Sequence, residues 1–227
     1  MIHEFSRVGK HHTDIGLEKQ DYICHYEDEQ YICIVLADGV STCAKSGEGA
    51  RIAGSALLNM LSLRASLLFE MDDDKVRDYT LKHVVYELNK EADANGDDLA
   101  LYSSTLAACL YDKKEERYLV FSLGDSMVMA VGYGRTNLLG KPDDSTSGCP
   151  VTTISDAPKY TNIIRGEGNY EMFMVLSDGA WHEMFDRNRI KDEVAGMLNE
   201  CDIDALKKYL EDQDPFDDYS FIAAGIG

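Results

Sequence analysis

The sequence has little positive charge: 22 lysines and arginines stand against 41 aspartates and glutamates, which gives a formal net charge of −19. A surface with this balance repels polyanions, so we expect no general affinity for nucleic acid or for an anionic membrane. It also repels phosphate groups. Phosphate chemistry in this protein would therefore need local positive charge, and bound metal ions are the most economical source.

Other features are scarce or absent. The chain has 4 prolines, no Gly/Ser-rich or Pro-rich tract and no internal repeat, so its 227 residues are most simply one domain, 1–227. Its six cysteines include no C-x-x-C pair, which argues against a zinc site or a disulfide framework. The N-terminus lacks the features of a signal peptide, and no apolar run approaches the length of a transmembrane helix. The sequence therefore predicts a soluble, cytoplasmic protein.

Two apolar segments each end in an Asp-Gly pair. Residues 34–37 lead into Asp38-Gly39, and residues 172–177 lead into Asp178-Gly179. Each segment is typical of a buried strand that ends in a carboxylate. One such Asp-Gly is a common way to begin a turn. Two unpaired carboxylates at the ends of buried strands are costly unless they share a countercharge, most simply a divalent metal ion.

The hydrophobic pattern predicts groups of strands separated by helices. We expect strands at 2–8, 22–26, 31–36, 103–110, 117–123, 127–131, 172–176 and 219–226, and helices at about 50–61, 75–95, 181–185, 190–200 and 203–210. Residues 9–21 are expected to form a polar loop, 124–126 a tight turn between successive strands, and 132–169 a loop or short flap. This order favours an α+β fold in which helices are layered over antiparallel sheets.

Five aspartates fall at the edges of the predicted strands: Asp21, Asp38, Asp125, Asp178 and Asp217. Asp21 and Asp38 flank the two strands of one hairpin at the same end, so their carboxylates can meet. A sandwich of two sheets could gather all five into one cleft. An all-oxygen cluster favours Mg²⁺ or Mn²⁺ over zinc, with Ca²⁺ left open by ligand type. Two such ions bridged by an aspartate would supply a hydroxide-like water and neutralise a phosphate.

With these residues the sequence resembles the type 2C metal-dependent protein phosphatases, the PPM family of serine/threonine phosphatases. The resemblance is nearly chain-long and rests on seven markers in order: Gln20-Asp21, Ala37-Asp38-Gly39, Ser46-Gly47-Glu48-Gly49-Ala50, Ser104-Thr105-Leu106, Leu123-Gly124-Asp125-Ser126, Leu176-Ser177-Asp178-Gly179 and Asp217-Asp218-Tyr219-Ser220. Gly9-x-x-His12 and Gly16 ahead of them look most like a bacterial branch of that family.

The resemblance implies a four-layer α-β-β-α sandwich with two central antiparallel sheets. It also implies hydrolysis of phosphoserine and phosphothreonine by a metal-activated water, with a phosphorylated protein as substrate and a Ser/Thr kinase or its targets as partners. The implied cofactors are two Mg²⁺ or Mn²⁺ ions, with a third in bacterial members. The implied ligands are Asp38 as the bridge, the Gly39 carbonyl, Asp178 and Asp217 at the first ion, Asp21 near the second, and Asp125 with Asp178 at the third. Asp218 would be a neighbouring support.

The chain departs from the family pattern at several positions. Gly16 stands where many members carry a phosphate-binding arginine, and Gln20 stands where many carry an acid. His12 is the first candidate to replace the arginine as a catalytic, phosphate-binding group. His11, Lys19 and Arg7 are further candidates, and a solvated loop residue is an equally good reading of each. Asp178 follows Asp125 by only 53 residues, which implies a reduced flap and altered substrate recognition. Val40-Ser41-Thr42 also lacks the histidine that many members have there.

These departures keep a second hypothesis open: a catalytically weak or inactive regulatory or binding module on a phosphatase fold. The retained Asp38, Asp178 and Asp217 favour the enzyme, because a non-catalytic module need not keep them. An acidic calcium-binding protein is a third reading. It finds little support, because the sequence has no Asp-x-Asp loop with a closing Glu.

Overall fold

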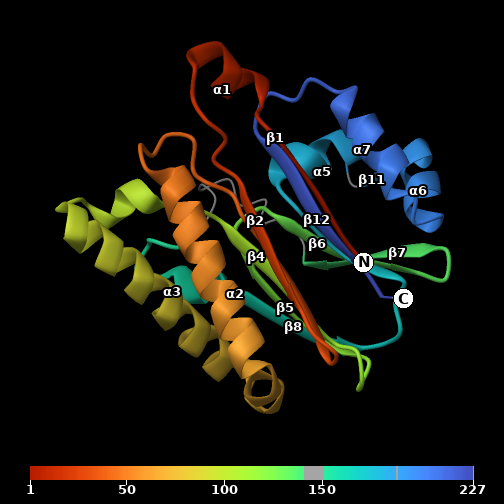
Figure 1. Ribbon diagram of the computed structural model, residues 1–227, viewed down its shortest axis with the longest axis horizontal. Coiled ribbons are helices and arrows are strands. Elements are labelled where there is room, and N and C mark those ends of the chain that lie inside the picture. The colour runs from red at the N-terminus through yellow and green to blue at the C-terminus, as the bar shows by residue number, and fades with distance from the viewer. Residues whose placement is uncertain (141–150, 188, 227) are drawn as a thin grey trace.

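A computed structural model of the chain describes residues 1–140, 151–187 and 189–226. Two five-stranded sheets lie face to face, and helices cover the outer face of each (Figure 1). Every neighbouring strand pair in the two sheets is antiparallel. The predicted α-β-β-α sandwich is confirmed.

The first sheet, here sheet A, contains both ends of the chain. Its order is β1 (Ile2–Arg7), β12 (Tyr219–Gly225), β9 (Met172–Leu176), β6 (Met127–Gly132) and β7 (Arg135–Gly140). The second sheet, sheet B, has the order β2 (Tyr22–Glu27), β3 (Tyr31–Ala37), β4 (Leu106–Asp112), β5 (Arg117–Leu123) and β8 (Asn162–Glu167). The chain therefore passes between the sheets several times.

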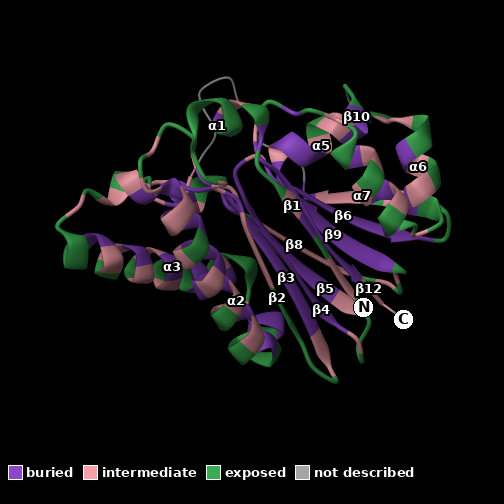
Figure 2. Ribbon diagram, turned by 45° about the horizontal axis from the view of Figure 1, so that its top comes forward, coloured by how far each residue is buried: buried purple, intermediate pink, exposed green. Residues whose placement is uncertain are grey.

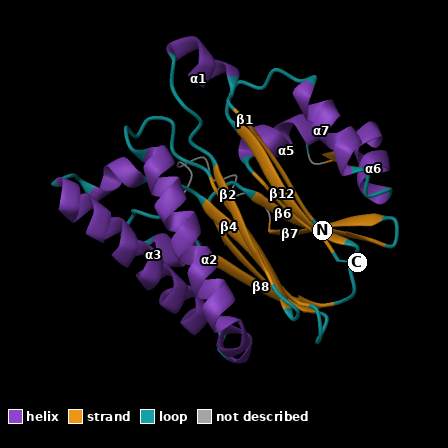
Figure 3. Ribbon diagram, in the orientation of Figure 1, coloured by secondary structure: helices purple, strands orange, loops and turns teal. Residues whose placement is uncertain are grey.

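The helices form two groups, one for each sheet (Figure 3). Long helices α2 (Ser46–Glu70) and α3 (Asp73–Asn95) cover sheet B, while α5 (Asp178–Met184), α6 (Asp192–Asn199) and α7 (Ile203–Glu211) cover sheet A. The short elements are α1 (Lys10–Ile15), η1 (Leu99–Tyr102), α4 (Ala157–Tyr160), β10 (Phe185–Asp186) and β11 (Arg189–Ile190). At the start of α3, the Asp72 side chain accepts a hydrogen bond from the Lys75 N–H at 2.9 Å, as expected of an N-cap.

Three apolar cores fill the space between these layers. Figure 2 shows that the central strands of both sheets are buried along most of their length. Strand β3 illustrates why its sequence is apolar throughout and does not alternate with polar residues. Ile32, Ile34 and Leu36 belong to the core between the sheets, whereas Cys33 and Val35 belong to the core beneath α2 and α3. A strand buried on both faces has no solvent-facing positions, so its last residue, Ala37, brings Asp38 directly out of the core.

Four sequence-based expectations were wrong in part. The segment 132–169 is not only a loop or flap: it contains β7 and β8, which form an outer edge of each sheet, and α4. Residues 141–150 of that predicted flap lie outside the described residues. The predicted loop 9–21 contains α1. Residues 124–126 do not turn between two paired strands, because β5 belongs to sheet B and β6 to sheet A. The first long helix extends well beyond 50–61.

Helix α2 also corrects the statement that no segment approaches the length of a membrane span. Its 25 residues have a window of mean hydropathy 1.5, which is long and apolar enough to cross a bilayer. Half of that window is buried inside the molecule. Ala50, Ala53, Leu57 and Leu61 pack in the core against sheet B and α3, which is the behaviour of a core helix.

Candidate metal centre

Asp21 and Asp38 meet at one edge of sheet B. The register of β2 and β3 pairs Tyr22 with Ala37, so the residue before one strand lies across from the residue after the other. Asp21 is buried, with 4% of its surface exposed. Both of its carboxylate oxygens are buried and lack a hydrogen-bond partner among the described residues. The predicted meeting of the two aspartates is confirmed, and Asp21 has the unsatisfied oxygens that a cation or its bound water would use.

Four of the five predicted carboxylates open into one cleft of about 390 Å³: Asp38, Asp125, Asp178 and Asp217. Its other described lining residues are Gly39, Val40, Ser41, Cys43, Ser103, Thr105 and Val151. The two sheets contribute jointly, because Asp38 follows β3 of sheet B while Asp178 and Asp217 flank β9 and β12 of sheet A. No lysine, arginine or histidine is among the described residues that line the cleft.

Mutual repulsion and burial raise the pKa values of these acids. Burial raises the pKa of Asp38 well above its usual value, and the carboxylates of Asp21, Asp178 and Asp125 raise it further. Burial raises the pKa of Asp21 to about 7, with Asp218 and Asp178 adding to the effect. Burial, followed by Asp125 and Asp217, also raises the pKa of Asp178. Such a cluster favours either protonation or a bound cation. All-oxygen donors and orphaned buried oxygens fit Mg²⁺ or Mn²⁺.

The backbone at Gly39 is held between two other segments. A Cβ at this position would lie 2.9 Å from the Gln20 carbonyl oxygen and 2.8 Å from the Ser46 carbonyl carbon, so only glycine fits. On its other side, the Thr105 N–H donates to the Asp38 carbonyl at 2.8 Å and the Val40 N–H donates to the Ser103 carbonyl at 3.1 Å. The Asp38-Gly39 turn is therefore fixed at the cleft wall.

Asp125 lies on the connection between sheet B and sheet A. The indole N–H of Trp181, on α5, donates to the Asp125 carbonyl oxygen at 2.9 Å. Trp181 is the only tryptophan of the chain and also packs on the core beneath α5. This contact ties the connection to the helix that begins with Asp178.

The Asp217-Asp218 pair sits between two glycines. A Cβ on Gly9 would lie 2.2 Å from the Asp217 carbonyl carbon, and one on Gly179 would lie 2.2 Å from the Asp218 carbonyl oxygen. Neither substitution could be accommodated without moving the backbone. The absence of side chains at both glycines lets β12 begin against the first loop and α5.

Asp218 is a buried hydrogen-bond acceptor. The sequence predicted it only as a residue that supports the neighbouring metal ligands. Its Oδ1 accepts the Gly9 N–H at 2.8 Å and its Oδ2 accepts the Gln20 N–H at 2.6 Å. These bonds join residues about 200 positions apart, and no local pattern signals them. They fix both ends of the loop that carries Asp21.

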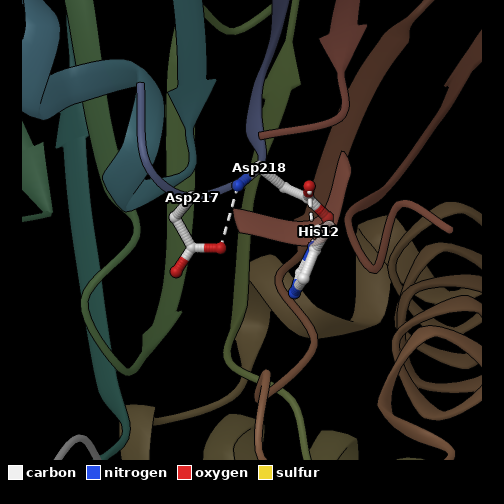
Figure 4. Close-up of side chains that lie close together, drawn as sticks. All are labelled: His12, Asp217 and Asp218. Atoms are coloured by element: carbon white, nitrogen blue, oxygen red, sulfur yellow. Dashed lines mark hydrogen bonds and ion pairs between the residues drawn. The ribbon is translucent and has the colours of Figure 1, made fainter. Parts of the chain in front are cut away.

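The candidate phosphate-binding residues lie elsewhere than predicted. His12 is 1% exposed, and its Nδ1 lies 2.9 Å from Oδ1 of Asp218 (Figure 4). His11 stacks on Phe216, Lys19 donates to the Ser6 hydroxyl, and Arg7 pairs with Glu211. None of the four lines the cleft. The prediction that His12 binds phosphate in the arginine's place is therefore not supported, because the side chain is buried.

Together, the fold and the site define an α-β-β-α sandwich protein with an acidic, metal-type cleft at one end of its paired sheets. Comparison with known proteins places it more closely. The family model described as protein phosphatase 2C matches residues 8–213. The chain belongs to the protein phosphatase 2C family. Members of this family are generally dependent on Mg²⁺ or Mn²⁺. No curated protein sequence matches the chain significantly.

Solved structures share the fold at low sequence identity. A bacterial serine phosphatase is 18% identical, with a TM-score of 0.68 over 100% of this chain and 98% of its own. The serine/threonine phosphatase of S. agalactiae is 16% identical, with a TM-score of 0.68 over 98% of each chain. A structure from the bacterial stressosome, described as a modular system adapted to control secondary messenger signalling, is 14% identical, with a TM-score of 0.58 over 98% and 97%. At these identities the likeness shows the fold.

Proposed function

We propose that this chain is a metal-dependent phosphatase that removes phosphate from phosphoserine and phosphothreonine in proteins. The observation that carries the proposal is the single cleft shared by Asp38, Asp125, Asp178 and Asp217, with Asp21 buried behind it. Membership of the protein phosphatase 2C family supports the same reaction class.

In this proposal the residues of the cleft bind the cations, and the cations bind the phosphate group of the substrate. Asp38, Asp178 and Asp217, with the Gly39 carbonyl, would hold two Mg²⁺ or Mn²⁺ ions, Asp21 would lie near one of them, and Asp125 would take part in a third site. Bound there, the ions would neutralise the phosphate's charge and lower the pKa of a water molecule at the phosphorus. The Thr105 N–H and the Trp181 indole N–H bond to the main-chain carbonyls of Asp38 and Asp125, and so they fix the backbone that carries these two carboxylates.

The negative charge of the cleft means that its described side chains cannot attract a phosphate group by themselves. Its described lining has four carboxylates and no basic side chain. A phosphate dianion would therefore be repelled by the ion-free cleft and attracted only when cations occupy it. Substrate binding as well as turnover should depend on the metal.

The same observation favours a second candidate, a regulatory or binding module with little turnover. The described residues of the cleft include no basic group for phosphate, so they lack the positioning that a charged donor would give. The stressosome structure with this fold belongs to a signalling assembly. This candidate predicts metal binding and a partner, without hydrolysis.

The deciding experiment measures hydrolysis of p-nitrophenyl phosphate and of a phosphothreonine peptide by purified protein with Mn²⁺, Mg²⁺, Ca²⁺ or EDTA. Asp38→Asn and Asp178→Asn are compared with the wild-type protein, and Asp186→Asn, at an exposed acid away from the cleft, is the matched control. We expect turnover with Mn²⁺ or Mg²⁺ that falls at least about 1000-fold in the two cleft variants. Wild-type-like turnover in either folded variant would disprove the proposed enzyme. Metal binding without turnover would favour the module.

A further inference from the structure

His12 is a buried imidazole with an unused ring nitrogen. It lies on α1, and only 1% of its surface is exposed. Its Nδ1 is 2.9 Å from Asp218 Oδ1, outside the alignment of a good hydrogen bond, and its Nε2 is buried with no hydrogen-bond partner among the described residues. A buried polar nitrogen without a partner destabilises the fold, so its position calls for an explanation.

The carboxylate of Asp217 lies close to the His12 imidazole, and a cation bound between them would explain the unpartnered ring nitrogen. One ring nitrogen of His12 and one carboxylate oxygen from each of Asp217 and Asp218 lie within 4.8 Å of one another. Figure 4 shows the His12 ring and the two carboxylates around one small space. Opposite ligands of a cation with bonds of about 2.1 Å are about 4.2 Å apart, so small movements would bring the His12 imidazole and the Asp217 carboxylate onto one ion.

The arrangement matches the usual surroundings of a metal-binding histidine. Such a histidine binds the ion with one ring nitrogen and points its other N–H at a carboxylate that fixes the tautomer. Asp218 has that position beside Nδ1 and is itself held by the Gly9 and Gln20 N–H groups. This leaves Nε2 as the free donor. Asp217 also lines the acidic cleft, so one residue connects the imidazole to the cluster.

We propose that His12 is a nitrogen ligand to a divalent cation that Asp217 also binds, with Asp218 orienting the imidazole. The inference rests on the proposed function, because Asp217 is one of the ligands assigned there. It adds a histidine to a site otherwise made of oxygen. Imidazole binds Co²⁺ and Zn²⁺ more strongly than Mn²⁺, and it binds each of these ions more strongly than Mg²⁺. A site with a histidine ligand should therefore prefer these transition metals over Mg²⁺.

The test is pulsed electron paramagnetic resonance of Mn²⁺ bound to the full chain. We expect a ¹⁴N coupling from a directly bound imidazole in the wild-type protein, which changes to a ¹⁵N coupling when histidine is labelled. The coupling should disappear in His12→Gln and persist in His11→Gln. His11 is the matched control, because it is the neighbouring histidine and stacks on Phe216. Circular dichroism establishes that both variants are folded.

A second readout is the ratio of Mn²⁺ to Mg²⁺ affinity by titration calorimetry. His12→Gln should weaken Mn²⁺ binding by roughly tenfold or more and change Mg²⁺ binding less, while His11→Gln should leave the ratio unchanged. Wild-type protein that binds Mn²⁺ and hydrolyses the phosphopeptide without any histidine coupling would overturn the inference and leave the proposed function standing. A protein that binds Mg²⁺ but no Mn²⁺ would overturn the inference alone, and one that binds neither ion would overturn both.

Discussion

Asp217 and Asp218 are adjacent in the sequence and have opposite surroundings. Asp217 is half-buried and faces the acidic cleft, where no described basic side chain balances its charge. Asp218 is 2% exposed and accepts two backbone N–H groups from a distant loop. An aspartate side chain therefore has no described basic partner at position 217, whereas at position 218 both of its carboxylate oxygens accept hydrogen bonds.

This difference in hydrogen bonding separates aspartates suited to binding a cation from aspartates that stabilise the fold. A carboxylate to which the protein supplies few donors, as at Asp217, is suited to an external cation, whereas a carboxylate whose two oxygens both accept backbone N–H groups, as at Asp218, holds the fold together. The same contrast divides the wider site. Asp21 and Asp38 repel one another, while Asp218 joins Gly9 and Gln20. Substitution to asparagine should therefore cost much stability at Asp218 and little or none at the aspartates of the cleft.

The largest effect on stability should come from Asp218→Asn. The amide has one acceptor oxygen, so one of the two N–H groups would face an NH₂ group and remain buried without a partner. We expect the free energy of unfolding in EDTA to fall by about 2–4 kcal/mol, measured by urea denaturation. Asp217→Asn is the control and should lose less than about 1 kcal/mol, because it keeps an oxygen for the Asp218 N–H. Equal losses in the two variants would contradict the division.

The pH dependence of the metal-free protein should show the next largest effect. Asp21 has a pKa of about 7 in the folded protein against 3.8 for the ordinary side chain. The folded state therefore binds more protons than the unfolded state between about pH 4 and pH 7. Stability should fall as the pH rises through this window, by roughly 2 kcal/mol for this residue once the protein's relaxation is allowed for.

The slope is best measured as the difference between wild-type protein and Asp21→Asn, both in EDTA. Exposed carboxyls with a lowered pKa, such as Asp72 beside Lys75, act in the opposite direction and cancel in this difference. The variant should have a flatter profile of melting temperature against pH. Parallel profiles would show that Asp21 does not titrate in this range. Saturating Mn²⁺ should reverse the slope, because cation binding favours the ionised carboxylates.

The smallest effect should be a gain in stability for Asp38→Asn in EDTA. Removing one negative charge relieves repulsion from Asp21, Asp178 and Asp125. We expect a gain of about 1 kcal/mol, or a rise of about 2–4 °C in melting temperature, by differential scanning calorimetry. The gain should vanish with Mn²⁺ present, since the wild-type protein then gains the binding energy of the ion. A loss of stability in EDTA would mean that Asp38 has a structural role as well.

The sequence predicted the central strands and long helices well because their apolar patterns are strong. It missed β7 and β8 because both lie at the edge of a sheet, where polar and half-exposed residues such as Arg135 and Asn162 weaken the alternation. It also read 124–126 as a turn within one sheet. Nothing in the local sequence distinguishes such a turn from a crossing between two sheets.

The candidate site divides in the same way. Asp38 and Asp178 could be found because each ends a buried strand, and the hairpin register could be expected to bring Asp21 to Asp38. The role of Asp218 could not be found, because its partners are backbone groups about 200 residues away. His12 was assigned to phosphate from its position in the motif, as the first candidate to replace the missing arginine. The packing of α1 against residues 215–218, just before β12, buries it.

Sheet A pairs the first strand of the described fold with the last, β1 with β12, from Ile2 opposite Ala224 to Arg7 opposite Tyr219. During synthesis, β1 leaves the ribosome long before its partner exists. Sheet B and helices α2 and α3 need only the first two-thirds of the chain and one later strand, so they can form first. The Asp217-Asp218 turn arrives with β12. A nascent chain interrupted just before that point would contain every strand of sheet B but no finished cleft.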